Sequence, residues 1–190
     1  MDWFYEYFFP AIWTVFLVYW QVRARGTKQT QRLEPISSRI LRSLAFLCAI
    51  ALLMVPHIPA PWLYRQLLPQ GQGMFFLGAI LTIVGLLFAV WARAYLGTNW
   101  SRSVTIKQDH ELIVGGPYAL VRHPIYTGIL TGFLGSAIAL GQVRGFIALA
   151  LVALALWAKL RMEEKWIREQ FGASYETYSR RVAALVPFVL

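Results

Sequence analysis

Long apolar stretches alternate with shorter polar segments along the whole chain. A helix that spans a membrane needs about 20 mostly apolar residues, with a usual range of about 17–25. Two of the stretches meet this length easily, and the last two are short and joined by a brief turn, as in a helical hairpin. The pattern predicts an all-α integral membrane bundle of about five transmembrane helices. The five apolar blocks are Trp3–Val22, Ile40–Ile58, Met74–Leu96, Ile125–Leu140 and Gly145–Leu160.

Two polar segments stand out between and after these blocks. Residues 97–124 form the longest polar stretch, and its alternation at Val104–Lys107 indicates a short extended piece. Aromatic residues recur at three- and four-residue spacing over Met162–Val182, which predicts a C-terminal amphipathic helix interrupted near Gly172. We expect one membrane domain over residues 1–190, with three spans in 1–96 and the polar loop, hairpin and C-terminal helix in 97–190.

The composition and the charge pattern set the orientation in the membrane. The chain is 58% hydrophobic, carries a net charge of +9, and has 18 basic residues. All of these except Arg65 and Arg144 lie in or beside three segments: between the first and second blocks, between the third and fourth, and after the fifth. The positive-inside rule then predicts a multi-pass protein with its N-terminus outside and its C-terminus in the cytoplasm. Acidic Asp2 and Glu6 stand where a signal peptide would have a basic region, so we expect the first block to be retained.

The positive charge needs no nucleic-acid partner. The basic residues are dispersed over three loops rather than gathered on one face, so we expect no nucleic-acid binding. Attraction to the headgroups of anionic membrane lipids accounts for the same charge. The oligomeric state is open, because the small residues Gly128, Gly132 and Gly135 would serve a contact between subunits or an internal helix contact equally well.

A cluster of unusual composition lies at the mouth of the fourth block, in the sequence Gly115–Gly128. Gly116 and the proline after it form a turn that lets backbone approach a ligand. Arg122, His123 and Pro124 then open a helix whose positive end suits a ligand carboxylate. Polar groups at a membrane edge indicate function by default. The competing interpretation is a helix start whose Arg and His simply meet lipid headgroups.

A second cluster follows the fifth block. Glu163 and Glu164 lie next to Lys159, Arg161 and Lys165. Ordinary ion pairing explains such carboxylates, and the functional alternative is that one of them holds a cationic group of a ligand.

Metal binding is the less favoured interpretation of the polar residues near the fourth block. His110 and His123 lie on either side of Tyr118, close to several carboxylates, but the spacing of metal-binding histidines is absent. The single Cys48 excludes an internal disulfide and a C-x-x-C metal motif. We therefore expect a pocket of hydrogen-bonding groups and no metal.

Together the two clusters resemble a known family. The pattern H-x-L-I-x-x-G-P-Y-x-x-x-R-H-P-x-Y-x-G over His110–Gly128 is similar to the signature of the isoprenylcysteine carboxyl methyltransferases, as is E-E-x-x-x-x-x-x-F-G-x-x-Y-x-x-Y over Glu163–Tyr178. The resemblance covers about the last 80 residues. The same architecture occurs in phospholipid methyltransferases, and a related C-terminal region occurs in membrane sterol reductases, so the family alone does not fix the substrate.

The resemblance implies an S-adenosylmethionine pocket at the cytoplasmic face, with S-adenosylhomocysteine as the product. It implies a prenylated or otherwise lipophilic acceptor, and the short chain resembles prokaryotic members, which places the protein in an inner membrane. The family has an acceptor-side Arg where this chain has Lys159, which lacks the guanidinium fork. The implied catalytic and acceptor-side residues are Arg122, Lys159, Arg161 and Glu164, and the implied cofactor-binding residues are His110, Glu111, Leu112, Ile113, Gly116, Tyr118, His123, Pro124, Ile125, Tyr126 and Glu163.

Three functions are consistent with these patterns. The leading one is methylation of a lipophilic carboxylate, which is ionised at neutral pH and needs alignment rather than a general base. The second is methylation of a lipid amine, or an NADPH-linked reduction, on the same scaffold. The third is a membrane sensor or assembly factor without catalysis, which predicts no cofactor binding.

Overall fold

The fold is all-α, as predicted, and is described from a computed structural model that covers residues 2–23, 30–97, 105–107 and 112–187. The two strands form a single short antiparallel pair. The second of them confirms the extended piece expected near residue 104. The elements in chain order are α1 (Asp2–Arg23), β1 (Thr30–Leu33), α2 (Ile36–Met54), the 3₁₀ turn η1 (Pro61–Tyr64), α3 (Gln72–Leu96), β2 (Thr105–Lys107), the 3₁₀ turn η3 (Gly116–Ala119), α4 (Pro124–Leu140), α5 (Val143–Phe171) and α6 (Ala173–Ser179).

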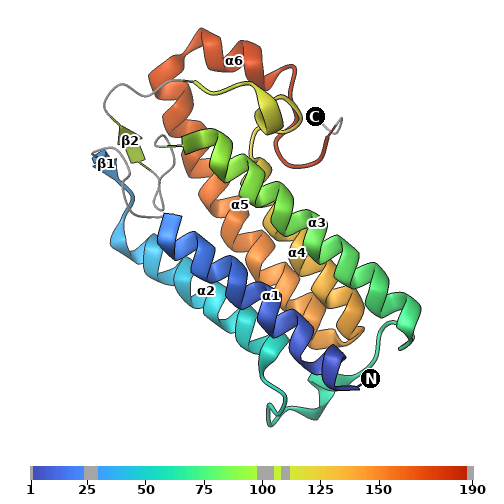
Figure 1. The fold of residues 1–190 in the computed structure, drawn as a ribbon. Coiled ribbons are helices and arrows are strands. Elements are labelled where there is room, and N and C mark those ends of the chain that lie inside the picture. The colour runs from blue at the N-terminus through green and yellow to red at the C-terminus, as the bar shows by residue number, and fades with distance from the viewer. Residues whose placement is uncertain (1, 24–29, 98–104, 108–111, 188–190) are drawn as a thin grey trace.

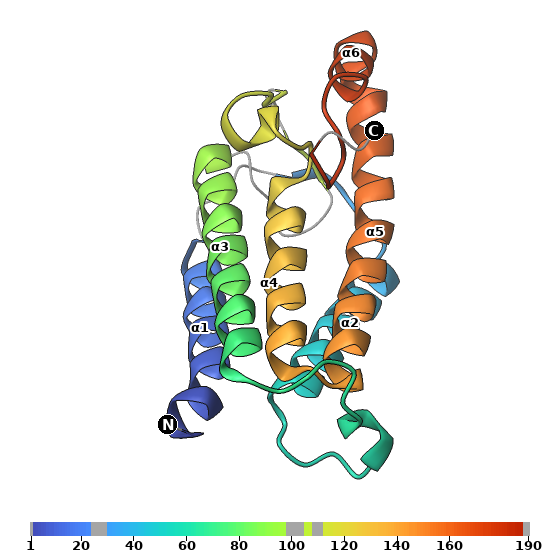
Figure 2. The same ribbon diagram turned by 90° about the vertical axis from the view of Figure 1, so that its right-hand side faces the viewer.

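The long helices alternate in direction through the bundle (Figure 1). The strands, η3, the start of α4, the end of α5 and α6 gather at one end, which we call the α6 end. The start of α1 and the turn η1 lie at the opposite end. Figure 2 shows α4 between α3 and α5, and α2 packs against α5.

Three helices of the described residues are long and apolar enough to span a membrane: α2, α3 and α5. The fourth, α4, has 17 residues and is apolar but shorter. Helix α1 has 22 residues and is rich in Trp and Tyr, residues that favour the membrane interface over its core. The chain is thus an integral membrane protein by its helices, and a topology of five spans stays a prediction.

The end of α5 differs from the sequence prediction. We expected the fifth apolar helix to stop near Leu160 and a separate amphipathic helix to begin at Met162. Instead α5 runs unbroken for 29 residues, because the residues after Leu160 are good helix formers and Lys159 and Glu163 pair one turn apart. The break comes only at Gly172, which has a φ of 49°. A helix of this length measures about 43 Å, longer than a bilayer core of about 30 Å, so its last turns extend towards α6.

Helices α3 and α4 pack backbone against backbone. A Cβ atom added to Gly85 would lie 2.6 Å from the carbonyl oxygen of Gly128, and one added to Gly128 would lie 2.4 Å from that of Gly85. Gly78 and Gly135 meet in the same way about two helical turns away. The small residues of α4 therefore serve an internal contact, and their partner is α3 rather than the hairpin helix α5.

Buried polar contacts tie α1 to this pair of helices. The indole Nε1 of Trp13 donates to the Oγ of Ser136 at 3.0 Å, and Thr82 donates to the carbonyl of Gly132 at 3.2 Å. Buried Arg93 donates to the carbonyls of Gly97 and Arg23, at 2.9 and 2.6 Å. These contacts hold the last turns of α1 and α3 at the α6 end.

Candidate functional site

The loop before α4 is built around a tight turn. Gly116 has a φ of 57°, and an added Cβ would lie 2.6 Å from the ring of Tyr95. Both the backbone conformation and the lack of space therefore require glycine here. The turn buries Tyr118, whose backbone N–H donates to the carbonyl of Gly115 at 3.1 Å. The hydroxyl of Tyr178 in turn donates to the carbonyl of Tyr118 at 2.5 Å. The segment before α4 is thus fastened to the segment after α5.

Arg122 makes most of the hydrogen bonds that join these two segments. Its Nε donates to Oε1 of Glu164 at 2.9 Å, and its Nη1 donates to the carbonyl of Ser179 at 2.9 Å and to the carbonyl of Val182. The interpretation of Arg122 as a headgroup contact is therefore wrong for this conformation. It is a structural clamp between α4, α5 and the segment after α6.

Backbone N–H groups at the start of α4 are also hydrogen-bonded, to carbonyls of the segment after α6. The N–H groups of Arg122 and His123 donate to the carbonyls of Ala183 and Ala184, at 2.8 and 3.0 Å. The hydroxyl of Thr127 donates to the carbonyl of Leu185 at 2.7 Å. The chain itself supplies the acceptors of these two N–H groups, and the expectation that the start of this helix binds a ligand carboxylate stays a prediction for the remaining donors.

The carboxylate of Glu163 lies among three side chains. The hydroxyl of Tyr126 donates to its Oε2 at 2.6 Å, the Nδ1 of His123 lies 3.6 Å from the same oxygen, and the Nζ of Lys159 lies 3.6 Å from Oε1. The side chain of Glu163 is 21% exposed, against 15% for Glu164. Glu163 is therefore the more accessible of the two carboxylates.

Glu164 faces the other side of His123. Its Oε1 lies 2.8 Å from Nη2 of Arg122 and 3.4 Å from Nε2 of His123. The ring of His123 stacks parallel on that of Tyr126 at 5.3 Å, and the Nζ of Lys159 lies 5.4 Å from the centre of the Tyr126 ring. We refer to Arg122, His123, Tyr126, Lys159, Glu163 and Glu164 as the site cluster.

The tyrosines around the cluster remain protonated at neutral pH. Burial raises the pKa of the Tyr178 hydroxyl to about 12. Burial also raises the pKa values of Tyr118 and Tyr175 above their usual range, and the carboxylate of Glu163 or Glu164 adds to each rise. All three hydroxyls are therefore neutral, and Tyr178 is a hydrogen-bond donor.

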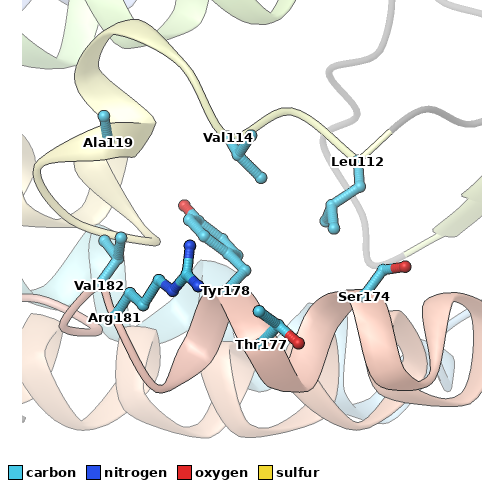
Figure 3. Close-up of a pocket in the computed structure, with 8 residues that line it drawn as sticks. All are labelled: Leu112, Val114, Ala119, Ser174, Thr177, Tyr178, Arg181 and Val182. Atoms are coloured by element: carbon cyan, nitrogen blue, oxygen red, sulfur yellow. The ribbon is translucent and has the colours of Figure 1, made fainter.

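A pocket of about 430 Å³ lies between the segment before α4 and the chain from α6 onwards (Figure 3). Leu112, Val114 and Ala119 line one wall, and side chains from α6 and the segment after it line the other. Tyr178 and Arg181 point between the two walls. The second wall consists of Ser174, Thr177, Tyr178, Arg181 and Val182.

Five other predicted cofactor residues remain. Ile113 packs against the hydrophobic core, and Pro124 and Ile125 are buried in the first turn of α4. The predicted contacts His110 and Glu111 lie outside the described residues.

Arg161 does not join the cluster. Its side chain is exposed and lies 6.0 Å from the ring of Trp157. Of the two basic residues considered for the acceptor side, only Lys159 faces the carboxylates. The described residues contain no group of three or more His, Cys, Asp or Glu side chains placed to hold a metal ion.

One pair near the cluster was not singled out from the sequence. Arg42, on the inner face of α2, pairs with Glu34, whose side chain is fully buried. The position of Arg42 inside an apolar block could have indicated a function. Because Arg42 is close to the preceding polar loop, we counted it only among the basic residues that set the membrane orientation.

This fold and cluster define a class of membrane enzymes. Residues 74–174 match the family described as phospholipid methyltransferase. The match spans more than half of the chain, so the chain belongs to the phospholipid methyltransferase family.

Within this family, the chain is similar to individual isoprenylcysteine O-methyltransferases. A protein of rice (Oryza sativa), named a probable protein-S-isoprenylcysteine O-methyltransferase, is 27% identical over 80% of this chain and 81% of its own length. The protein-S-isoprenylcysteine O-methyltransferase of Schizosaccharomyces pombe is 35% identical over 52% of this chain and 43% of its own. The resemblance to isoprenylcysteine carboxyl methyltransferases is thereby confirmed.

A solved structure shares the fold. The eukaryotic intramembrane Ras methyltransferase, an isoprenylcysteine carboxyl methyltransferase, superposes with a TM-score of 0.52 at 22% identity. The superposition covers 81% of this chain but only 52% of that longer one.

Proposed function

We propose that the protein transfers a methyl group from S-adenosylmethionine to the carboxylate of a lipophilic acceptor at the cytoplasmic face of the membrane. The observation that carries the proposal is the position of Glu163. This accessible carboxylate is oriented by the Tyr126 hydroxyl and by Lys159, at the end of the bundle where the family signature lies. The charge pattern of the loops favours the cytoplasm for this end.

The residues present fit the proposed cofactor. Glu163 accepts one hydrogen bond at 2.6 Å and has a longer contact of 3.6 Å to Lys159, so lone pairs of a carboxylate remain to accept from an ammonium group. His123, Tyr118 and the pocket beside Leu112 would hold the remaining parts. When bound, S-adenosylmethionine supplies an activated methyl group on a sulfonium.

The protein's own contribution is alignment and exclusion of water. A carboxylate acceptor is already ionised, so no side chain has to remove a proton from it. Holding two reactants in line lowers the barrier by itself. Lys159 orients the acceptor anion, and the Arg122 clamp keeps α4, α5 and the segment after α6 closed around the site.

Binding tests the cofactor half of the proposal. Detergent-purified protein is titrated with S-adenosylmethionine, S-adenosylhomocysteine and NADPH, and compared with the Glu163→Gln and His123→Ala variants. We expect micromolar binding of the two sulfur compounds and at least a tenfold weaker affinity in Glu163→Gln, since a charge-assisted hydrogen bond contributes about 1.5–3 kcal/mol. The matched control is Glu169→Gln, an exposed carboxylate further along α5.

The alternatives give different results. NADPH binding without sulfur-compound binding indicates a reductase on this scaffold. Binding of none of the three, or full affinity in Glu163→Gln, contradicts the proposed site.

The name of the matched family favours a second acceptor, the amine of a phospholipid. An amine must lose a proton before methylation, so this reaction needs a base such as His123. Methyl transfer to phosphatidylethanolamine vesicles that is lost in His123→Ala, with no transfer to a prenylcysteine, indicates the amine reaction.

A further inference from the structure

Arg42 is a charged residue on the inward face of an apolar helix. Ala49, on the same face of α2, is fully buried, and the ring of Phe46 lies 6.3 Å from that of Phe133 in α4. Arg42 precedes Phe46 by one helical turn, on the side nearer the α6 end. Side chains of a helix lean towards its N-terminus, which for α2 is the α6 end. Its guanidinium is thereby directed towards the level of the site cluster.

Glu34 fixes the orientation of this guanidinium. Nη1 of Arg42 donates to Oε2 of Glu34 at 2.8 Å, and Nη2 donates to Oε1. The Glu34 side chain is 0% exposed, whereas that of Arg42 is 16% exposed. Such a two-point contact defines the plane of the guanidinium as well as its position. Two of its five N–H donors are used in this way among the described contacts.

The pair lies within electrostatic range of the cluster, across the contact between α2 and α5. Arg42 interacts electrostatically with Tyr126 and Glu163, and Lys159 interacts with both Arg42 and Glu34. Two cations, on two packed helices, thus both attract the carboxylate of Glu163.

The charge balance indicates what these cations are for. Arg42 and Lys159 are matched by the carboxylates of Glu34 and Glu163. If Glu163 turns to the ammonium group of a cofactor, as proposed above, its negative charge is shared with that group. The positive charges of Arg42 and Lys159 then favour an anionic acceptor between α2 and α5. A cationic amine would instead meet two like charges.

We propose that Arg42, held by Glu34, is a second acceptor-binding residue, which acts with Lys159 to hold the carboxylate of a lipophilic acceptor between α2 and α5. The inference rests on the proposed methyltransferase function. Arg42 would supply, from α2, the guanidinium fork that Lys159 lacks.

The test uses N-acetyl-S-farnesylcysteine, a small prenylcysteine with a free carboxylate, and its neutral carboxamide. Binding of each probe, and of S-adenosylhomocysteine, is measured on the detergent-purified full chain. The variants are Arg42→Gln and the double variant Glu34→Gln/Arg42→Gln, which removes both charges and leaves no unpaired buried carboxylate. Arg39→Gln, an exposed arginine on the same helix, is the matched control.

We expect the wild type to prefer the carboxylate probe. Both variants should weaken its binding by about tenfold or more, the range for a lost hydrogen bond to a charged group. Affinity for the carboxamide and for S-adenosylhomocysteine should change less than about threefold, a difference below 1 kcal/mol. Arg39→Gln should behave as the wild type in all three titrations.

Two results would overturn the inference. One is unchanged carboxylate affinity in the double variant. The other is an equal loss for carboxylate and carboxamide, which would show that the pair only maintains structure. Absence of S-adenosylhomocysteine binding in the wild type counts against the proposed function instead. The carboxylate preference, measured without cofactor, still decides the role of Arg42.

Discussion

Glu163 and Glu164 are adjacent in the chain but have different partners. Neighbouring residues of a helix point about 100° apart, so Glu163 reaches Tyr126 and Lys159 while Glu164 reaches Arg122. His123 lies between the two carboxylates. In the proposed function Glu163 is the carboxylate that binds a ligand, whereas Glu164 pairs with Arg122.

This division predicts different consequences for the same substitution. Glu164→Gln leaves Arg122 without its charged partner in a largely buried pair, a loss of about 3–5 kcal/mol in comparable cases. We expect a clearly lower melting temperature, whereas Glu163→Gln should keep the wild-type value and lose ligand affinity. Thermal unfolding in detergent, combined with the binding titration, separates the two. A stable Glu164→Gln protein would contradict the role of Arg122 as a clamp.

Tyr178 gives a prediction for alkaline pH. Its pKa in the folded protein is about 12, above the value near 10 of an unfolded chain. The neutral hydroxyl therefore stabilises the fold fully below pH 10, and this contribution is lost as the pH rises from about 10 through about 12. Tyr178→Phe should lower the melting temperature at pH 8 and should make it fall less steeply above pH 10. An identical slope for both proteins would argue against a buried Tyr178 hydroxyl.

At the scale of elements, the apolar blocks predicted which helices exist but not where they end. The fifth helix continues eleven residues beyond its apolar part because helix-forming charged residues follow, and apolar content alone says nothing about such residues. Gly172 marked the real break, as expected from its sequence position. The partner of the α4 glycines was not predictable either, since small residues favour close contact without naming the other helix.

The α3–α4 contact leads to a prediction with an internal control. An added methyl group at Gly85 meets the backbone of α4 at 2.6 Å, whereas nothing lies within 4 Å of an added Cβ at Gly73 on the same helix. Gly85→Ala should destabilise the protein by about 1–3 kcal/mol. Gly73→Ala should be neutral or slightly stabilising, because alanine favours a helix by up to about 1 kcal/mol over glycine. Equal melting temperatures for the two variants would contradict the close packing.

At the scale of the molecule, the site draws on four separate parts of the chain. The family signature predicted His123, Tyr126, Lys159 and Glu163 together, because a motif records residues that act jointly. It did not predict Arg42 and Glu34, whose distance in sequence from both motifs hides their proximity. Only the packing of α2 on α5 brings that pair to the cluster.

The arrangement of the helices also predicts a topology that labelling can check. Alternating helix directions place η1 and α6 at opposite ends of the bundle. Cys48, the natural cysteine, is replaced by serine, and single cysteines are introduced as Gln70→Cys near η1 and Ala173→Cys in α6. In intact cells a membrane-impermeant maleimide should label the first and should label the second only after permeabilisation. The reverse pattern would place the site outside the cytoplasm.

The backbone hydrogen bonds between the start of α4 and residues 183–184 have a consequence for biogenesis. Arg122 and His123 are synthesised some sixty residues before Ala183 and Ala184, as their sequence separation requires. Until then Arg122 and His123 lack their carbonyl partners, so a nascent chain holds its membrane helices without a finished site. Assembly of the site therefore ends with the docking of this C-terminal segment against the start of α4.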